Sequence, residues 1–518
     1  MKAMNGAQSL VRTLLAGGID TCFANPGTSE MHFVAALDQV PGMRCVLCLF
    51  EGVATGAADG YARMTGKPAA TLLHLGPGLA NGLANLHNAR KAQVPLVNIV
   101  GDHAIYHLYE EAPLTSDVAG FARPVSHWVR SSKAATEVSA DGAAAIAAAK
   151  SNGGQVATLI LPANTAWEEA NAAVAVTPAP APRPLVEDRA VAPIVEVLRS
   201  KEAAVLFLGG AGLSERGLHA AGRVAAKTNV RLLAPTSNAR IARGVGRVPI
   251  PTLPYPLQEA IENLKDVRHL ILAGSQRPVA YFAYPGKPAF ATPVDCQIHT
   301  LVKPEEDVVE ALERLAHALD AKSAPHLAQK RLRAEKLSGP MTPESFAAVI
   351  AQMIPDQAIV ADESLSFGRG LLPATSNSAP HDWLQLTGGA IGIGLPLATG
   401  AALACPDRKV MCLQADGSGM YTLQSLWTHA REGLDIVTLI LANRTYATLR
   451  GELVNVGVTN PGPNALAMLD LHKPILDWTS LAEGMGVEAS RAEDTEGLMF
   501  QLEKALGRHG PSLIEVVI

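Results

Sequence analysis

The feature that most constrains this fold is a unit repeated along the chain: a short apolar run rich in β-branched residues, a turn, and then a helical pattern. Near the C-terminus, residues 409–413 and 436–441 are two such runs, each as apolar as a strand that is buried on both faces. Strands that alternate with helical segments predict parallel sheets covered by helices. The predicted fold class is therefore α/β.

Two linker-like stretches divide the 518 residues into three parts. Residues 176–188, "VTPAPAPRPLVED", are rich in Pro, and residues 322–345 are charged and contain Pro. The remaining parts are 1–175, 189–322 and 342–518, and we expect each to be a doubly wound parallel-sheet domain. In such sheets ligands bind at the carboxyl ends of the strands.

Composition excludes several classes of function. Hydrophobic residues make up 48% of the chain, but no uninterrupted apolar run reaches about 18 residues, so we expect no membrane span. The net charge is −5 and there is no basic block, so we expect no nucleic-acid partner. Residues 1–18 lack the apolar centre of a signal peptide. Cys45 and Cys48 lie in a predicted strand, where cysteine is small apolar filler, and we expect a cytoplasmic protein with reduced thiols.

Oxygen-bearing residues follow both C-terminal runs. Asp416 and the Gly-rich residues 417–419 come after the first run, and Asn443 comes after the second. Residues 420–432, "MYTLQSLWTHARE", have a helical period, so we expect the Gly-rich loop to open a single helix. Glycines in a loop that opens a helix let backbone N–H groups approach a phosphate, but a carboxylate beside a phosphate requires a cation between them. Mg²⁺ takes hard oxygen ligands and bridges diphosphates. We expect the two runs to be adjacent strands, and this spacing then favours a metal–diphosphate site. The alternative is a helix-capping Asp with an ordinary strand-end Asn.

The stretch "ADGSGMYTLQSLWTHAREGLDIVTLILANRT" resembles the thiamine diphosphate (ThDP) motif, which begins Gly-Asp-Gly and ends in Asn after the next strand. The resemblance implies Mg²⁺ held by Asp416, Asn443 and the Thr445 carbonyl. Ala415 replaces the first Gly and Arg444 replaces a second Asn, but neither change removes a ligand side chain. The cofactor contacts that the resemblance implies, besides Glu51 below, come from Ser366, Ile391, Gly417, Ser418 and Tyr446.

A second motif lies far from the first. "LFEGVATGAADGYARMTGKPA" resembles the family's stretch in which a Glu precedes Ala-Asp-Gly-Tyr-Ala, and it places Glu51 after a strand and at the start of a helix. The resemblance implies that Glu51 hydrogen-bonds the aminopyrimidine and promotes the imino tautomer that takes the C2 proton. Its alternative is a first-turn acid that complements the helix dipole. Ile391, in "TGGAIGIGLPLATGA", either supports the bent cofactor or packs in the core.

Nearly the whole chain is similar to two branches of this family, benzoylformate decarboxylase and the acetolactate synthases. "FANPGTSEMHF" places Thr28 at a serine of the decarboxylase, where its hydroxyl could bind a substrate carboxylate, and "TLLHLGPG" places His74 at an active-site histidine. Residues 76–78, Gly-Pro-Gly, are instead typical of the synthases. Tyr281 aligns with a second decarboxylase histidine, and a phenol with a pKa of about 10 is a poorer proton shuttle.

Three functions therefore compete. The first is ThDP- and Mg²⁺-dependent decarboxylation of a small 2-oxo acid, extending to carboligation, and His74 favours it. The second is an acetolactate synthase-type transferase that condenses two 2-oxo acids, which residues 76–78 and Tyr281 allow. The third is a non-catalytic ThDP-binding relic or regulatory subunit, against which the intact Glu51 and Asp416 argue.

The resemblance also implies an assembly. The Glu51 domain of one subunit would face the diphosphate domain of another, so we expect at least a homodimer and, for the full assembly, a homotetramer. In relatives the middle domain binds FAD, ADP or nothing. A single Gly-rich turn, "LFLGGAGLSERG", is weak evidence for a nucleotide, so we expect an empty middle domain, with FAD as the alternative.

Overall fold

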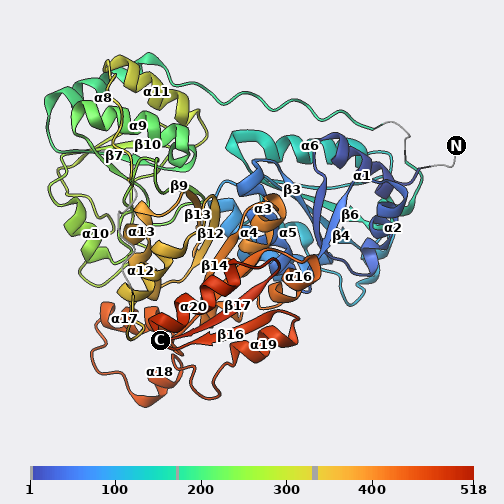
Figure 1. The fold of residues 1–518 in the computed structure, drawn as a ribbon. Helices are drawn as coiled ribbons and strands as arrows, with labels where there is room; N and C mark the ends of the chain where they lie inside the picture. Colours follow the sequence, from blue (N-terminus) through green and yellow to red (C-terminus); the bar gives the residue numbers. More distant parts are fainter. Residues whose placement is uncertain (1–3, 171–173, 330–336) are drawn as a thin grey trace.

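The computed structural model describes residues 4–170, 174–329 and 337–518. Within these ranges the chain forms three mainly parallel sheets covered by helices, which confirms the α/β prediction. Figure 1 shows the N-terminal domain in blue, the middle domain in green and yellow, and the C-terminal domain in orange and red. Residues 330–336 of the second predicted linker, and residues 1–3, lie outside the described part. No helix of the described part is long and apolar enough to cross a membrane.

The N-terminal sheet has six parallel strands in the order β2-β1-β3-β4-β6-β5. Every residue of β3, β4 and β6 is buried, as expected where helices cover both faces. The strands are β1 (Thr21–Asn25), β2 (Arg44–Leu47), β3 (Ala69–Leu73), β4 (Leu96–Asp102), β5 (Trp128–Ser131) and β6 (Val156–Pro162). The helices are α1 (Gly6–Ala16), α2 (Met31–Gln39), α3 (Glu51–Thr65), α4 (Leu75–Lys91), α5 (Val118–Ala122), α6 (Val138–Lys150) and α7 (Ala163–Trp167).

The middle sheet has four parallel strands in the order β11-β10-β7-β8. Its strands are β7 (Ala204–Leu208), β8 (Arg231–Leu233), β10 (His269–Ala273) and β11 (Gln297–Val302), and its helices are α8 (Asp188–Ser200), α9 (Glu215–Thr228), α10 (Leu257–Leu264) and α11 (Val308–Ala318). Residues 174–187 form neither helix nor strand and cross from the first domain to α8 along the top of Figure 1, as the Pro-rich composition predicts.

The C-terminal sheet has seven strands in the order β16-β17-β15-β14-β12-β13-β9. The strands are β12 (Ala358–Glu363), β13 (His381–Gln385), β14 (Val410–Ala415), β15 (Ile436–Ala442), β16 (Glu488–Ala492) and β17 (Ser512–Val517), all parallel, and β9 (Ile241–Arg243), antiparallel to β13. The helices are α12 (Pro343–Met353), α13 (Leu371–Ala374), α14 (Gly394–Ala404), α15 (Asp416–Gly419), α16 (Ser425–Glu432), α17 (Ala447–Asn455), α18 (Pro463–Ala467), α19 (Trp478–Gly484) and α20 (Thr495–Leu506). β9 is supplied by the middle segment, which the linker positions did not predict.

The two C-terminal apolar runs are adjacent strands, as predicted. β14 and β15 pair in parallel up to Ala415↔Leu441, so Asp416 and Asn443 leave the sheet at the same edge. The single helix expected after Asp416 is instead interrupted between α15 and α16. In that turn the Thr422 hydroxyl donates to the carbonyl of Gly392 at 2.8 Å, and this tertiary contact overrides the local helical pattern.

Helices α3 and α14 pack through their backbones. A Cβ on Gly60 would collide with the carbonyl of Leu397, and a Cβ on Gly400 would collide with the carbonyl of Ala57. Only glycine permits so close an approach. Because Glu51 begins α3 and the loop that carries Ile391 leads into α14, this contact fixes the two segments relative to each other.

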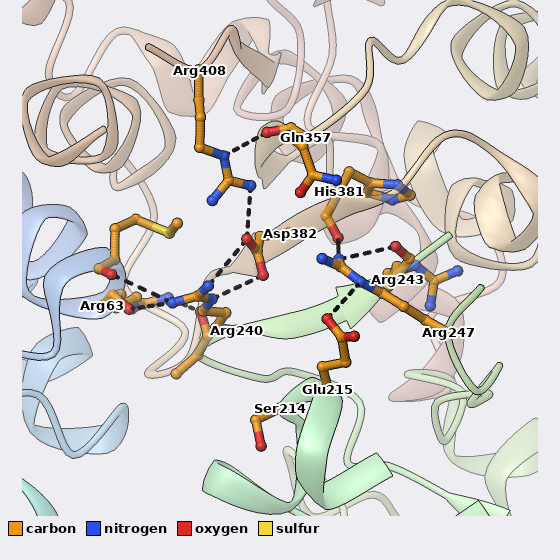
Figure 2. A network of polar contacts seen from close by, with 12 residues as sticks. Arg63, Ser214, Glu215, Arg240, Arg243, Arg247, Gln357, His381, Asp382 and Arg408 are labelled. Atoms are coloured by element: carbon orange, nitrogen blue, oxygen red, sulfur yellow. Dashed lines mark hydrogen bonds and ion pairs between the residues drawn. The ribbon is translucent and has the colours of Figure 1, made fainter. Parts of the chain in front are cut away.

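A network of arginines around Asp382 joins the three domains (Figure 2). Arg63 of α3 donates to the carbonyl of Gln385 at 2.7 Å. Arg240 of the middle segment donates to both Asp382 oxygens at 2.9 and 3.1 Å, and Arg408 adds a third bond at 2.7 Å. Burial acts to raise the pKa of Asp382, but its guanidinium partners outweigh burial and leave the pKa lowered, so this carboxyl stays ionised.

Candidate active site

Glu51 lies at the carboxyl edge of the N-terminal sheet, as the first residue of α3. Its side chain is almost completely buried. Asn81 of α4 donates its amide to Glu51 Oε2 at 2.9 Å. Gly78 makes room for the other oxygen, because a Cβ there would lie only 3.0 Å from Oε1. One donor thus orients the carboxylate, which keeps lone pairs for a further hydrogen bond.

His74 lies between β3 and α4 and is held by an acid that the sequence reading missed. Its Nδ1 lies 2.8 Å from Glu30 Oε2, and the same oxygen accepts the backbone N–H of Gly27 at 2.8 Å. Burial raises the pKa of Glu30, although its hydrogen bond to His74 opposes the rise. The imidazole packs on Gly27, where any Cβ would collide with the ring. The hydrogen bond fixes the ring, whichever of the two groups holds the shared proton.

The sequence indicates the local role of Glu30 near Gly27 but not its pairing with His74. It stands three residues after Gly27, the spacing at which an acidic side chain turns back to a helix-starting backbone N–H. Its pairing with His74 spans 44 residues, so no periodic pattern reveals it. The second oxygen, Oε1, is buried without a partner in the described chain and abuts Gly101 of β4.

Thr28 directly follows Gly27, on which the His74 ring packs, whereas Tyr281 lies in another domain. Thr28 begins a short 3₁₀ helix after β1 and is exposed. Tyr281 belongs to the middle domain and is 46% exposed. Its hydroxyl shares a 3.1 Å hydrogen bond with Ser237, and its ring centroid lies 5.0 Å from that of Tyr255. In the described chain neither contact involves Glu51 or His74.

Asp416 is held at the end of β14 by two backbone donors. Gly417 N–H donates to Oδ1 at 2.8 Å, and Arg444 N–H donates to Oδ2 at 2.7 Å. Burial raises the pKa of Asp416, and the two backbone bonds only partly offset this effect. Arg444 has a positive φ of 56°, which turns the chain so that Asn443 Oδ1 accepts the N–H of Thr445 at 3.1 Å.

The residues at this edge fit a hard divalent cation. Asp416, Asn443 and the Thr445 backbone offer carboxylate, amide and carbonyl oxygens, the ligand types that Mg²⁺ takes. Among the described residues no group of three or more His, Cys, Asp or Glu could hold a metal, which is consistent with this mixed oxygen set. A buried carboxylate that meets only backbone donors would gain from a cation. Tyr446 packs its ring on Gly417, where a Cβ would lie 2.6 Å from the ring.

A second buried acid, Glu363 at the end of β12, was also missed. It is 1% exposed and accepts the backbone N–H groups of Gly392 and Gly394 at 2.6 and 2.7 Å. Gln414 Nε2 donates to the same carboxylate at 3.1 Å and to Ser418 Oγ at 2.6 Å. Burial raises the pKa of Glu363 to about 7. This acid therefore joins the loop around residue 391 to the loop after β14.

The remaining predicted residues lie on loops at the same C-terminal edge. Ser366 follows β12 and precedes a short 3₁₀ helix, and Ile391 precedes α14; both are half-buried. Asn88 of α4 connects the N-terminal domain to the loop that contains Ile391. Its Nδ2 donates to the Ala390 carbonyl at 2.7 Å, and its Oδ1 accepts the Gly388 N–H at 3.1 Å. The helix capped by His74 therefore holds the loop that carries Ile391.

Two family descriptions match the chain. Residues 4–120 match "Thiamine pyrophosphate enzyme, N-terminal TPP binding domain", and residues 371–516 match "Thiamine pyrophosphate enzyme, C-terminal TPP binding domain". Thiamine pyrophosphate is another name for ThDP. The two matched regions contain the Glu51 group and the Asp416 group respectively.

Individual relatives span almost the full length. A Mycobacterium tuberculosis protein with the provisional name acetolactate synthase large subunit IlvX is 50% identical over 516 residues, 99% of each chain. Benzoylformate decarboxylase of Pseudomonas aeruginosa is 30% identical over 537 residues, 96% of each chain. The solved ThDP-dependent 4-hydroxybenzoylformate decarboxylase of Rhodococcus jostii RHA1 superimposes with a TM-score of 0.85 at 26% identity, covering 99% of this chain and 98% of that one. The chain therefore belongs to the thiamine diphosphate-dependent enzymes, in the group that contains 2-oxo acid decarboxylases and acetolactate synthases.

Proposed function

We propose that this protein is a ThDP- and Mg²⁺-dependent decarboxylase of a small 2-oxo acid, similar to benzoylformate decarboxylase. The observation that carries the proposal is the hydrogen bond between the partly exposed His74 and the buried Glu30, at the same sheet edge as Glu51. An imidazole fixed by a carboxylate is suited to deliver a proton to the carbon that loses CO₂. Without that proton the aldehyde product cannot form.

The cofactor would be held at the C-terminal edge. Asp416, Asn443 and the Thr445 carbonyl would bind Mg²⁺, whose charge would compensate the buried carboxylate. Gly417 and Ser418 would receive the diphosphate at the start of α15. The further cofactor contacts that we propose are Ser366, Ile391 and Tyr446. When bound, ThDP supplies a thiazolium that accepts the electron pair released as CO₂ departs.

The N-terminal group would complete the site. Glu51 would accept the hydrogen bond of the cofactor's pyrimidine ring, and Asn81 keeps the carboxylate aligned for it. Thr28 would donate its hydroxyl to the substrate carboxylate. Tyr281 would line the mouth of the site, where a phenol donates hydrogen bonds but exchanges protons slowly at neutral pH.

The second candidate is an acetolactate synthase-type transferase, and two observations favour it. Residues 76–78 form a Gly-Pro-Gly in the first turn of α4, and the resemblance to benzoylformate decarboxylase places Tyr281 near a second histidine of that enzyme. Tyr281 would be a weaker proton donor than histidine, so the carbon that has lost CO₂ would be protonated more slowly. That carbon would then have time to attack a second 2-oxo acid or an aldehyde. Carboligation would therefore accompany or replace aldehyde release.

We propose a homodimer as the minimal active unit, assembling to a homotetramer. The support for this assembly is the family resemblance, in which the Glu51 domain of one subunit faces the diphosphate domain of another. We further propose that the middle domain carries no FAD, and the absorption spectrum of the purified protein tests this directly.

Product analysis by NMR tests the function. Apo protein with ThDP and Mg²⁺ would receive benzoylformate and pyruvate in separate tubes, with tubes lacking either cofactor as controls. Benzaldehyde that depends on both cofactors would support the decarboxylase, and acetolactate from pyruvate would support the transferase. Calorimetry would show whether ThDP binds; binding without turnover of either substrate would contradict this substrate assignment.

A further inference from the structure

A cluster of tyrosines and one glutamate lies between the middle domain and α17. We call it the tyrosine–glutamate cluster; it comprises Tyr255, Tyr281, Tyr284 and Glu452. Tyr284 donates its hydroxyl to Glu452 Oε2 at 2.8 Å, and Tyr255 donates to Oε1 at 3.3 Å. The Tyr281 ring packs against the Tyr255 ring, with the two centroids 5.0 Å apart. The half-buried Glu452 carboxylate therefore accepts hydrogen bonds from two phenol groups of the middle domain.

The Glu452 carboxylate of this cluster can accept further hydrogen bonds. A carboxylate has about four lone-pair positions, and the two hydroxyls occupy two of them. Burial, followed by the hydrogen bond and the charge of Glu452, raises the pKa of Tyr284 to about 12. Burial and the Glu452 charge raise the pKa of Tyr255 as well, so both phenols stay donors. The chain's own cations already approach these rings: the Arg369 guanidinium lies 5.5 Å from the Tyr255 centroid, and Lys287 Nζ lies 5.5 Å from that of Tyr284.

Two segments of the proposed active site converge on this cluster. α17 begins after Tyr446, whose ring lies against Gly417 of the proposed diphosphate loop. Glu452 follows six residues later, about 9 Å along the helix axis. Arg369, over the Tyr255 ring, stands three residues after Ser366. The cluster is therefore connected to both cofactor loops and lies within a substrate's length of one of them.

We propose that Glu452, presented by Tyr255 and Tyr284, recognises the side chain of the substrate, and that the substrate is a 2-oxo acid whose side chain ends in a hydrogen-bond donor. This rests on the proposed function, because it names the substrate class of the same site. The donor can be a cation such as a guanidinium or a phenolic hydroxyl, since both satisfy the spare carboxylate lone pairs. An analogue without a donor would leave the half-buried carboxylate unpaired when it displaces water, and so it would be rejected.

The same hydrogen bonds also hold α17 against the middle domain. If they served only to hold the two parts together, substitutions would have effects different from those expected of a substrate-recognition group. Loss of a purely structural contact lowers stability and slows every substrate alike. Loss of a recognition group changes the ranking of substrates. Matched pairs that differ only in the terminal donor therefore separate the two roles.

The experiment measures kcat/KM by CO₂ release from the holoenzyme with ThDP and Mg²⁺. One pair is 4-hydroxybenzoylformate and benzoylformate, and the other is 5-guanidino-2-oxopentanoate and 7-methyl-2-oxooctanoate, its apolar counterpart of the same length and shape. The wild type is expected to prefer the donor-bearing member of one pair by about tenfold or more, and that pair identifies the kind of donor. In Glu452→Leu this preference should fall below about threefold, because no acceptor remains. Tyr284→Phe, which keeps the charge but loses one hydroxyl, should fall between the two.

Controls separate the possible failures. Glu483→Leu makes the same change at an exposed position on α19 and should keep the wild-type preference. ThDP affinity by calorimetry and the unfolding temperature are measured for each variant. A wild type that turns over both apolar substrates as well as their partners would overturn the recognition role while the decarboxylase stands. Equal losses on all four substrates in Glu452→Leu would assign the cluster to domain docking instead. If the wild type binds ThDP but releases CO₂ from none of the four, the proposed function itself fails.

Discussion

Replacing Asp382 by Asn perturbs the junction of the three domains in Figure 2. The Asp382 side chain is 4% exposed and accepts three bonds from Arg240 and Arg408. Asn keeps the shape but removes the charge and turns an NH₂ group toward a guanidinium. Breaking a buried ion pair costs about 3–5 kcal/mol. Because the Arg240 side chain is 40% exposed and that of Arg408 is 21% exposed, water compensates the freed cations in part. We therefore expect a loss of about 2–3 kcal/mol in the free energy of unfolding.

Urea denaturation followed by tryptophan fluorescence measures this loss, since Trp383 is the next residue and is fully buried. Asp295→Asn is the matched control, because Asp295 also pairs with an arginine, Arg268, but both side chains are more than half exposed. That pair should contribute below about 1 kcal/mol. If the two variants unfold at the same urea concentration, the network does not stabilise the junction and the reasoning from burial is wrong.

The pH dependence of the same variant has a definite sign. The folded-state pKa of Asp382 is lowered, so its stabilisation is present above the unfolded pKa of about 3.9 and is lost as the pH falls through the folded pKa. The stability difference between wild type and Asp382→Asn should therefore be constant from about pH 8 to pH 5 and shrink below about pH 4. A difference that instead grows toward low pH would contradict an ionised, arginine-paired carboxylate.

Three further predictions concern the proposed site. Glu51→Gln should lower kcat by about 10²-fold or more, while the ThDP affinity measured by calorimetry stays within a few-fold of wild type. Normal turnover would contradict the role of Glu51 in activating the cofactor. Asp416→Asn should weaken Mg²⁺-dependent ThDP binding at least about tenfold, with EDTA-treated wild type behaving alike; unchanged binding would remove Asp416 from the metal site. Glu363, whose pKa is raised to about 7, contributes stability that is full below its unfolded pKa and is lost as the pH rises through 7. Relative to Glu363→Gln, the wild type should therefore lose about 2 kcal/mol between pH 5.5 and 8, and a flat difference in urea titrations would show that the group does not titrate there.

The parts of the fold that sequence reasoning predicted share a local cause. Apolar runs and helical periods are written in neighbouring residues, so the α/β class and the adjacent strands before Asp416 and Asn443 followed from pattern. The strand-to-helix position of Glu51 followed in the same way. The linker at residues 174–187 was also predictable, because its Pro-rich composition prevents regular structure and this cause is local.

The parts that sequence reasoning missed depend on contacts between distant segments. Glu30 is important because it meets His74, and Glu363 because it meets backbone groups 29 and 31 residues away; neither acid differs locally from an ordinary charged residue. The turn at Thr422 broke a good helical period because its hydroxyl found the Gly392 carbonyl. Tertiary contacts of this kind outweigh propensity and leave no periodic trace.

The antiparallel strand β9 limits how this protein can be divided or can have evolved. A fragment of residues 342–518 would contain the whole proposed metal site but would lack β9, and β13 would then present an open edge. All five residues of β13 are buried in the intact chain, so the fragment would expose a strand whose unpaired backbone N–H and C=O groups are a template for pairing with other molecules. The middle segment is thus not an insertion that could be gained or lost as a module. Any shortening of the middle segment would still have to keep the three residues of β9, which cover the edge of the C-terminal sheet.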